Sequence, residues 1–247
     1  MLKIENVSKS YGSKLAVDNL TLELKKGEIF GLLGPNGAGK TTTIKMLTGI
    51  LPIDKGTITI NGYNIATQPL EAKWQFSYVM DSPDLMLGSK GITYLNFLAN
   101  VYQLSKAEAS RRISILAERF DMTSVLNDKI QSYSHGMRQK MMVMGALINN
   151  PPLWVLDEPL TGLDPKSSFL LKEMMKEHTV AGNTVLFSTH VLEVAEKLCD
   201  RVGIISNGKL NFVGTLDELR AQSGQSSSLE QLFLELTESH YDEVNNA

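Results

Sequence analysis

The stretch GPNGAGKT, Gly34 to Thr41, combines three glycines with a lysine and a threonine at fixed spacing. It matches the pattern G-x-x-x-x-G-K-[ST], in which backbone N–H groups surround phosphate oxygens. Because glycine has no side chain, such a loop can approach the phosphates closely. Lys40 supplies a charge for the β and γ phosphates, and the Thr41 hydroxyl can ligate Mg²⁺. The stretch therefore predicts a nucleotide phosphate site.

The segments on either side of this loop have the pattern that the motif requires. The apolar run GEIFGLL before it predicts a buried strand, and the segment from Thr41 onward predicts a helix. That helix would point its positive N-terminal end at the same phosphates. A glycine-rich turn without a ligand is the alternative, and the strand and helix make it less favourable. The predicted nucleotide-binding residues of the loop are Gly34, Pro35, Asn36, Gly37, Ala38, Gly39, Lys40, Thr41 and Thr42.

Two carboxylates and a histidine stand where further predicted strands end. LWVLDEP places Asp157 and Glu158 directly after an apolar run, and TVLFSTH ends another run at His190. In an α/β sheet, these carboxyl ends open onto the ligand crevice. Asp157 is then the expected Mg²⁺ partner, through water, and Glu158 can accept a proton from the attacking water. We expect His190 to contact the γ phosphate, with a structural histidine as the alternative.

Patterns elsewhere predict an α/β core that a helical segment interrupts. From about Gly91 to Asn150 only helical patterns occur, and strands resume afterwards. The Asn207–Gly208 pair suits the two-residue turn of a hairpin. Two helical patterns around a Ser/Gly/Gln hinge follow, and we expect their polar end to fray. Further predicted strands are LKIENV, LTLELK, TITING and FSYVM.

The predicted elements form a single domain in three parts. Residues 1–86 and 151–215 make the α/β catalytic core, residues 87–150 a helical subdomain, and residues 216–247 a C-terminal helical tail. The formal net charge of −3 argues against nucleic acid or anionic lipid as an electrostatic partner. The single cysteine, Cys199, excludes an internal disulfide. Because neither a signal peptide nor roughly 18 consecutive apolar residues occur, we expect a soluble intracellular protein.

Five motifs together resemble the nucleotide-binding subunit of ATP-binding cassette (ABC) transporters, and the resemblance covers the chain to about Gly214. In order, they are GPNGAGKTT, YSHGM, LWVLDE, LTGLDP and STH. The resemblance implies a P-loop NTPase (RecA-like) α/β core with a small antiparallel N-terminal β-subdomain and an inserted helical subdomain. It implies Mg²⁺-dependent ATP hydrolysis that powers transport through a separate integral membrane permease subunit. The chain would lie in the cytoplasm, peripheral on the cytoplasmic face of the cell membrane.

The resemblance also explains YSHGM, which lies far in sequence from any nucleophile or base. In this family the segment is the signature motif, which binds ATP held on the phosphate loop of a second ATPase subunit. Ser134 and the Gly136 N–H would contact that γ phosphate. Tyr11 matches the aromatic that stacks on adenine, with an ordinary loop tyrosine as the alternative. LTGLDP, with Gly162, matches the segment that crosses the dimer interface.

Three positions depart from the family pattern. The family has glycine at the position of His135 and glutamine at that of Met137, but the retained Ser134 and Gly136 would carry the phosphate contacts. Asp81 stands where a glutamine touches Mg²⁺ or the attacking water. A carboxylate there would bind Mg²⁺ more strongly and repel the γ phosphate. We therefore expect Asp81 to be a catalytic and metal-binding residue that keeps the family glutamine's role in coupling to the membrane subunit and changes the Mg²⁺ dependence of hydrolysis.

The sequence also bears on the direction of transport and on residues outside the predicted site. SHGMRQK and the closing LEQLFLELT resemble the export branch, so we favour export over import. The alternatives are a soluble cassette ATPase acting on ribosomes or DNA, and a regulatory cassette without hydrolysis.

A basic cluster could meet the membrane subunit. We expect Cys199 and three core methionines to be packed, and we assign no partner to two histidines. The cluster is Arg111, Arg112, Arg138 and Lys140, the methionines are Met141, Met142 and Met144, and the histidines are His178 and His240.

Overall fold

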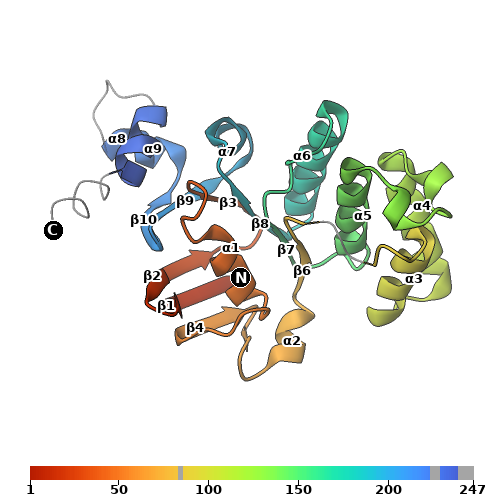
Figure 1. The fold of residues 1–247 in the computed structure, drawn as a ribbon, viewed down its shortest axis with the longest axis horizontal. Helices are drawn as coiled ribbons and strands as arrows, with labels where there is room; N and C mark the ends of the chain where they lie inside the picture. The colour runs from red at the N-terminus through yellow and green to blue at the C-terminus, as the bar shows by residue number, and fades with distance from the viewer. Residues whose placement is uncertain (83–85, 223–228, 239–247) are drawn as a thin grey trace.

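The strands form two sheets (Figure 1). The structure is a computed structural model and describes residues 1–82, 86–222 and 229–238. One sheet is four-stranded and antiparallel, in the order β2-β1-β4-β5, and the other is six-stranded, in the order β10-β9-β3-β8-β7-β6. The strands are β1 (Leu2–Tyr11), β2 (Lys14–Leu24), β3 (Ile29–Leu33), β4 (Lys55–Ile60), β5 (Tyr63–Asn64), β6 (Phe76–Val79), β7 (Leu153–Leu156), β8 (Thr184–Thr189), β9 (Arg201–Ser206) and β10 (Lys209–Gly214).

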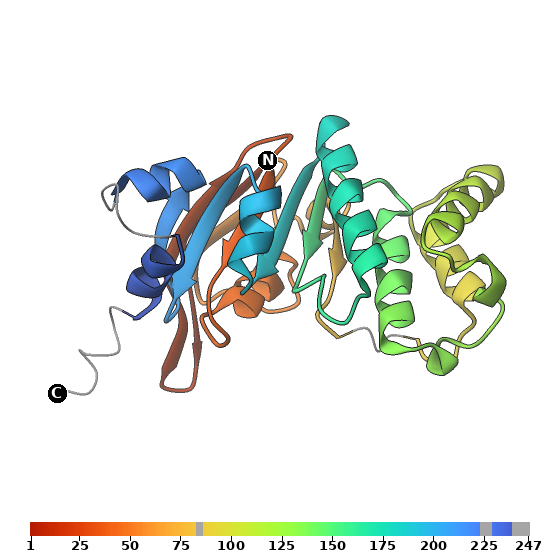
Figure 2. The ribbon, with the colours of Figure 1, turned by 90° about the horizontal axis from the view of Figure 1, so that it is seen from above.

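Helices lie on both faces and at one end of the six-stranded sheet. Figures 1 and 2 show α3 and α4 together at one end of the molecule and the C-terminal helices α8 and α9 at the other. The α-helices are α1 (Lys40–Leu47), α2 (Pro69–Lys73), α3 (Gly91–Val101), α4 (Lys106–Arg119), α5 (His135–Leu147), α6 (Pro165–Val180), α7 (Leu192–Leu198), α8 (Leu216–Gln222) and α9 (Leu229–Glu238). Two 3₁₀ turns, η1 (Thr123–Val125) and η2 (Ile130–Ser132), connect α4 to α5.

The antiparallel sheet forms because its strands alternate apolar and polar residues. Leu2 pairs with Leu24 and Ile4 with Leu22, and all four side chains are buried. They pack with α1 and with one face of the six-stranded sheet, so α1 lies between the two sheets. The small antiparallel N-terminal sheet predicted from the sequence is therefore present.

The central strands of the six-stranded sheet are buried on both faces. Every residue of β3, β7 and β8 is buried, which explains why these segments read as continuous apolar runs. Side chains of β7 alternate between two apolar cores: Leu153 and Val155 face the antiparallel sheet, while Trp154 and Leu156 face the helices. The second core continues into α3, α4 and α5, so the helical insert shares its core with the sheet.

The C-terminal helices pack on the edge of the six-stranded sheet. Leu219 of α8 and Leu229 and Leu232 of α9 share an apolar cluster with β9 and β10. The Ser206 Oγ donates a hydrogen bond to the Thr237 carbonyl oxygen at 3.0 Å. The two predicted helices are present, while the polar end and His240 lie outside the described residues.

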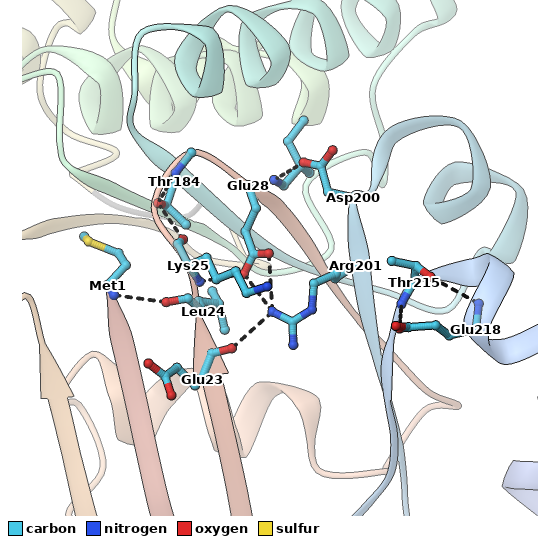
Figure 3. A network of polar contacts seen from close by, with 12 residues as sticks. Met1, Glu23, Leu24, Lys25, Glu28, Thr184, Asp200, Arg201, Thr215 and Glu218 are labelled. Carbon is cyan, nitrogen blue, oxygen red and sulfur yellow. Dashed lines mark hydrogen bonds and ion pairs between the residues drawn. The ribbon is translucent and has the colours of Figure 1, made fainter.

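A polar network holds the amino-terminal end of β3, opposite the phosphate loop (Figure 3). Arg201 Nη1 donates to both carboxylate oxygens of buried Glu28, at 3.1 and 3.3 Å. The Arg201 guanidinium also lies 5.7 Å from the centre of the Phe30 ring. Asp200 accepts a hydrogen bond from the Ile29 N–H at 2.7 Å. Arg201 Nη1 also donates to the Glu23 carbonyl oxygen at 3.3 Å, so the network joins β2, β3 and β9 at one end of the sheet.

The residues without an assigned chemical role are mostly packed. Met141, Met142 and Met144 are buried, as predicted. Cys199 is partly buried, and burial raises the pKa of its thiol. His178, on a segment that reads as polar, is in fact buried, with its ring edge against Trp154 at 5.7 Å between ring centres. In the described ranges, no helix combines the length and apolar content needed to cross a membrane.

Candidate functional site

A cavity of about 480 Å³ opens at the carboxyl end of β3, between the phosphate loop and the β1–β2 hairpin. This is the edge at which ligands bind in open α/β sheets. The cavity contains most of the predicted loop residues and three of the predicted residues outside the loop, Tyr11, Asp81 and Glu158. It is also lined by residues without a predicted role, which are Lys14, Leu15, Ala16, Asn207 and Gly208.

The phosphate loop passes close to its neighbours, and Gly39 is one of the positions that require glycine. Gly39 has a φ of +112°, and a Cβ atom there would lie 2.8 Å from the Ala16 carbonyl oxygen. α1 then begins at Lys40, so Thr41 and Thr42 lie in its first turn, and both line the cavity. The backbone geometry predicted for a phosphate-binding loop is therefore present.

Lys40 is nearly buried, with 6% of its side chain exposed. Its ammonium group donates to the Gly34 carbonyl oxygen at 2.6 Å and to that of Pro35 at 3.2 Å. It also lies 3.3 Å from Glu158 Oε1, which makes no hydrogen bond in the described residues, so this contact is an ion pair only. The loop thus holds a positive charge at the inner end of the cavity.

Asp157 is fully buried directly after β7. Its Oδ1 accepts a hydrogen bond from the Ser188 hydroxyl at 2.5 Å, whereas Oδ2 has no hydrogen-bond partner among the described residues. Burial raises the pKa of Asp157, the nearby hydroxyls of Ser188 and Thr41 oppose that shift, and the charge of Asp81 adds to it. A buried carboxylate oxygen without a partner, beside a threonine hydroxyl, suits a small oxygen-binding cation.

Glu158 connects three parts of the site. Its Oε2 lies 3.1 Å from the Nδ1 atom of His190, and its N–H donates to the Ser188 hydroxyl at 2.9 Å. The residue has a φ of +47°, an unfavourable conformation for a residue with a Cβ atom that occurs where function fixes the backbone. The turn directs the carboxylate toward Lys40 and the cavity.

Ser188 is a site residue that the sequence reasoning missed. It is fully buried in β8, beside β7, and its hydroxyl links the Asp157 carboxylate to the Glu158 backbone. A buried hydroxyl requires a hydrogen-bond partner, so a serine inside an apolar strand was a usable signal. Its partner lies 31 residues away, however, and only the pairing of the two strands reveals it.

Tyr11 and Asp81 line the cavity where the sequence predicts them. The Tyr11 side chain is 51% exposed at the end of β1. Asp81 is exposed just after β6, and its charge contributes to raising the pKa of Asp157. The unusual carboxylate at this position therefore acts on the same part of the site as Asp157.

Ser134 and Gly136 do not line the cavity. Ser134 is exposed and caps α5, because its hydroxyl accepts a hydrogen bond from the Met137 N–H at 3.3 Å. His135 packs against the LTGLDP segment: a Cβ atom at Gly162 would lie 2.4 Å from the His135 ring. The start of α5 and this segment thus form one exposed unit away from the loop of the same chain.

Comparison with known proteins shows relatives along nearly the entire chain. The family model described as "ABC transporter" matches residues 17–161. The linearmycin resistance ATP-binding protein LnrL of Bacillus subtilis is 39% identical over 91% of this chain and 72% of its own length. The Nod factor export ATP-binding protein I of Cupriavidus metallidurans is 38% identical over 89% of this chain and 72% of its own length.

Solved structures show the same fold. The structure described as the ATP-binding subunit of an ABC transporter is 38% identical, with a TM-score of 0.91, and the match covers 96% of this chain and 99% of that one. The dimeric ABC transporter cassette MJ0796 is 24% identical, with a TM-score of 0.80, over 87% of this chain and 99% of its own. The predicted P-loop NTPase fold is confirmed, and the chain belongs to the ABC transporter family as an ATP-binding, ATP-hydrolysing subunit.

Proposed function

We propose that the chain hydrolyses Mg²⁺-ATP as one half of a dimer of ATPase subunits and powers export through a separate membrane permease. The observation that carries the catalytic part is the position of Glu158. Its carboxylate lies between Lys40 and His190, next to the buried carboxylate of Asp157. The arrangement supplies a base, a phosphate-binding cation and a metal-binding group at one edge of the sheet.

Glu158 is the general base in this proposal. Its side chain is 20% exposed and lines the cavity, so a water molecule beside the γ phosphate can reach it. Lys40 exchanges its contacts with the loop carbonyls for the β and γ phosphates. His190 fixes the direction of the Glu158 carboxylate through Oε2 and contacts the γ phosphate. Tyr11, at the opening of the cavity, stacks on the adenine.

The residues beside the phosphate loop fit Mg²⁺. Oδ2 of Asp157, which has no hydrogen-bond partner among the described residues, and the Thr41 hydroxyl would hold the ion, Asp157 through water. Among the described residues, no group of three or more His, Cys, Asp or Glu side chains could hold a metal by itself. When bound, Mg²⁺ neutralises charge that develops on the phosphates. Asp81 contributes a further carboxylate to this region.

A second ATPase subunit completes each site in the proposal. Ser134 and the Gly136 N–H lie at the exposed start of α5, which has 13 residues and a positive N-terminal end. They bind the γ phosphate held by the loop of the partner subunit. The partner is a second copy of this chain or a related subunit. The packing of His135 on Gly162 keeps the signature motif and the LTGLDP segment together at that interface.

The transport part of the proposal rests on the relatives and on the motif resemblance. The names of two relatives refer to linearmycin resistance and to Nod factor export, which favours export over import. The chain would bind its permease at the cytoplasmic face of the cell membrane. The helical insert, α3 to α5, is the part expected to dock there.

The Glu158→Gln variant tests the catalytic part. The amide cannot take a proton from water, so turnover should fall by about 10²- to 10⁴-fold while ATP still binds. Gel filtration with ATP and Mg²⁺ should then show a stable dimer in place of a monomer. Lys40→Ala is the matched control, because it weakens phosphate binding and should remain monomeric. A Glu158→Gln protein that stays monomeric with ATP bound would count against the dimer.

Purification of the tagged chain from detergent-solubilised membranes of its host tests the transport part. A polytopic membrane protein that co-purifies at a fixed ratio is the expected result. Ribosomal proteins in its place would favour the soluble class of cassette ATPase. Neither result alters the assignment of the ATP site, which the Glu158→Gln experiment examines independently.

A further inference from the structure

We infer that the side-chain amide of Asn207 hydrogen-bonds the nucleoside part of the bound nucleotide. The inference rests on the proposed function, because it takes the cavity as the ATP site. Asn207 lies in the turn between β9 and β10, more than 160 residues beyond the phosphate loop in sequence. The structure nevertheless places it on the wall of the same cavity as Tyr11 and Lys40.

The Asn207 turn is fixed from several sides. The Gly208 N–H donates to the Ala38 carbonyl oxygen of the phosphate loop at 2.9 Å, and the Gly208 carbonyl oxygen accepts from the Asp18 N–H at 2.9 Å. Just before the turn, Ser206 bonds to the end of α9. A side chain on this turn therefore has a set position relative to the phosphate loop.

The place of the turn identifies the part of the ligand that it meets. The turn bonds to the phosphate loop through Ala38 and to β2 through Asp18, so it lies between the loop and the β1–β2 hairpin. The loop holds the phosphates, and the hairpin carries Tyr11 at the opening of the cavity. A group between these two faces the ribose and base rather than the γ phosphate.

The Asn207 amide is available for such a contact. The side chain is exposed, and its amide makes no hydrogen bond within residues 1–82, 86–222 and 229–238. An amide carries both donors and an acceptor, which match ribose hydroxyls and the polar edge of a purine. Neighbouring Lys14 and Leu15 line the same region and supply a cation and an apolar surface.

Backbone geometry offers a competing reason for asparagine at this position. Asn207 has a φ of +49° and Gly208 a φ of +78°, as in the two-residue hairpin turns that favour Asn-Gly. Glycine would serve that turn equally well, so the Asn207→Gly variant separates the two explanations. It keeps the backbone conformation and removes only the amide.

A second Asn-Gly turn provides a matched control. Asn61 and Gly62 join β4 to β5 with φ values of +50° and +92°, and neither residue lines the cavity. Asn61→Gly makes the same replacement in the same kind of turn, although it also removes the hydrogen bond that the Asn61 amide donates to Gln75 Oε1 at 2.8 Å. Any general effect of the exchange on folding should therefore be seen in both variants.

The test compares dissociation constants for ATP, 2′-deoxyATP and inorganic tripolyphosphate. For Asn207→Gly we expect ATP to bind about three- to tenfold more weakly, as for one lost hydrogen bond, with tripolyphosphate unchanged. Asn61→Gly should match the parent chain for all three ligands. A smaller loss for 2′-deoxyATP than for ATP assigns the contact to the 2′ hydroxyl of the ribose, and an equal loss assigns it to the base or to the 3′ hydroxyl.

Two results would overturn the inference. The first is an ATP affinity of Asn207→Gly equal to that of the parent chain. The second is an equal weakening of ATP and tripolyphosphate, which would mean that the exchange disturbs the phosphate loop instead. If the parent chain itself bound neither ATP nor tripolyphosphate, the proposed ATP site would fail, and with it the basis of this inference.

Discussion

The Nδ1 atom of His190 lies 3.1 Å from Oε2 of Glu158. The two residues come just after the adjacent parallel strands β8 and β7. The other carboxylate oxygen faces Lys40 at 3.3 Å. Glu158 is therefore restrained on one side by an imidazole and on the other by a cation. A base restrained in this way requires little reorganisation before it acts on a bound water molecule.

Removing the imidazole should slow hydrolysis and leave ATP binding nearly intact. For His190→Ala we expect kcat to fall by about 10²-fold or more, because Glu158 loses the group that orients it. Steady-state ATPase assays, with a separate binding measurement, give the two quantities. His190→Gln keeps a polar group near Oε2 and should retain a higher rate than the alanine variant. An unchanged kcat in His190→Ala would contradict the role.

Asp157 should make stability depend on pH. Burial raises its pKa, so the folded state binds this proton more tightly than the unfolded chain does. The free energy of unfolding therefore decreases as the pH rises through the folded-state pKa. Asp157→Asn removes the buried charge and can still accept the Ser188 hydrogen bond. Without Mg²⁺ at pH 7, this variant should be more stable than the parent chain.

The advantage of Asp157→Asn should shrink as the pH falls, because the parent carboxylate then becomes protonated. Thermal denaturation in EDTA over a pH series measures the difference between the two proteins. A difference that does not change with pH would exclude Asp157 as its source. Mg²⁺-ATP should stabilise the parent chain more than the variant, since the variant lacks the proposed metal-binding charge.

Asp81→Gln should change the Mg²⁺ requirement. The Asp81 carboxylate lines the cavity and its charge acts on Asp157, so an amide there reduces the negative charge around the ion. We expect the Mg²⁺ concentration for half-maximal hydrolysis to rise by about two- to fivefold. Repulsion of the γ phosphate is also reduced, which should lower KM for ATP. If both values and transport-coupled turnover were unchanged, Asp81 would have no such role.

Arg201→Met should destabilise the fold without altering the chemistry. Glu28 is 6% exposed and would lose the cation that contacts both of its carboxylate oxygens. Breaking one side of such a pair costs about 3–5 kcal/mol in the free energy of unfolding, measurable by chemical denaturation. Adding Glu28→Gln should recover part of that loss. The ATPase rate per folded molecule should not change, because the network lies at the other end of β3.

The sequence was most informative where local pattern and chemistry coincide. The loop at Gly34 to Thr41 required a strand before it and a helix after it, and both are present. The alternation in LTLELK predicts a strand, and its residues Leu20, Leu22 and Leu24 are all buried in β2. The Asn207–Gly208 turn followed from the left-handed conformations that a tight hairpin requires.

Contacts between distant segments could not be predicted in this way. Ser188 has its role only because β8 lies beside β7, and His178 is buried only because α6 covers Trp154. Asn207 lines the cavity because its turn bonds to Ala38, a contact between the two ends of the chain's core. The positive φ of Glu158 likewise has no signature in the LWVLDEP segment.

The alternation of β7 between two cores has a mechanical consequence. Two of its four side chains pack against the antiparallel sheet and two against the helices. Asp157 and Glu158 follow at its carboxyl end. Close-packed interiors have few voids and low compressibility, so they transmit displacements. A displacement of the helical insert should therefore also displace the carboxyl end of β7, and with it Asp157 and Glu158.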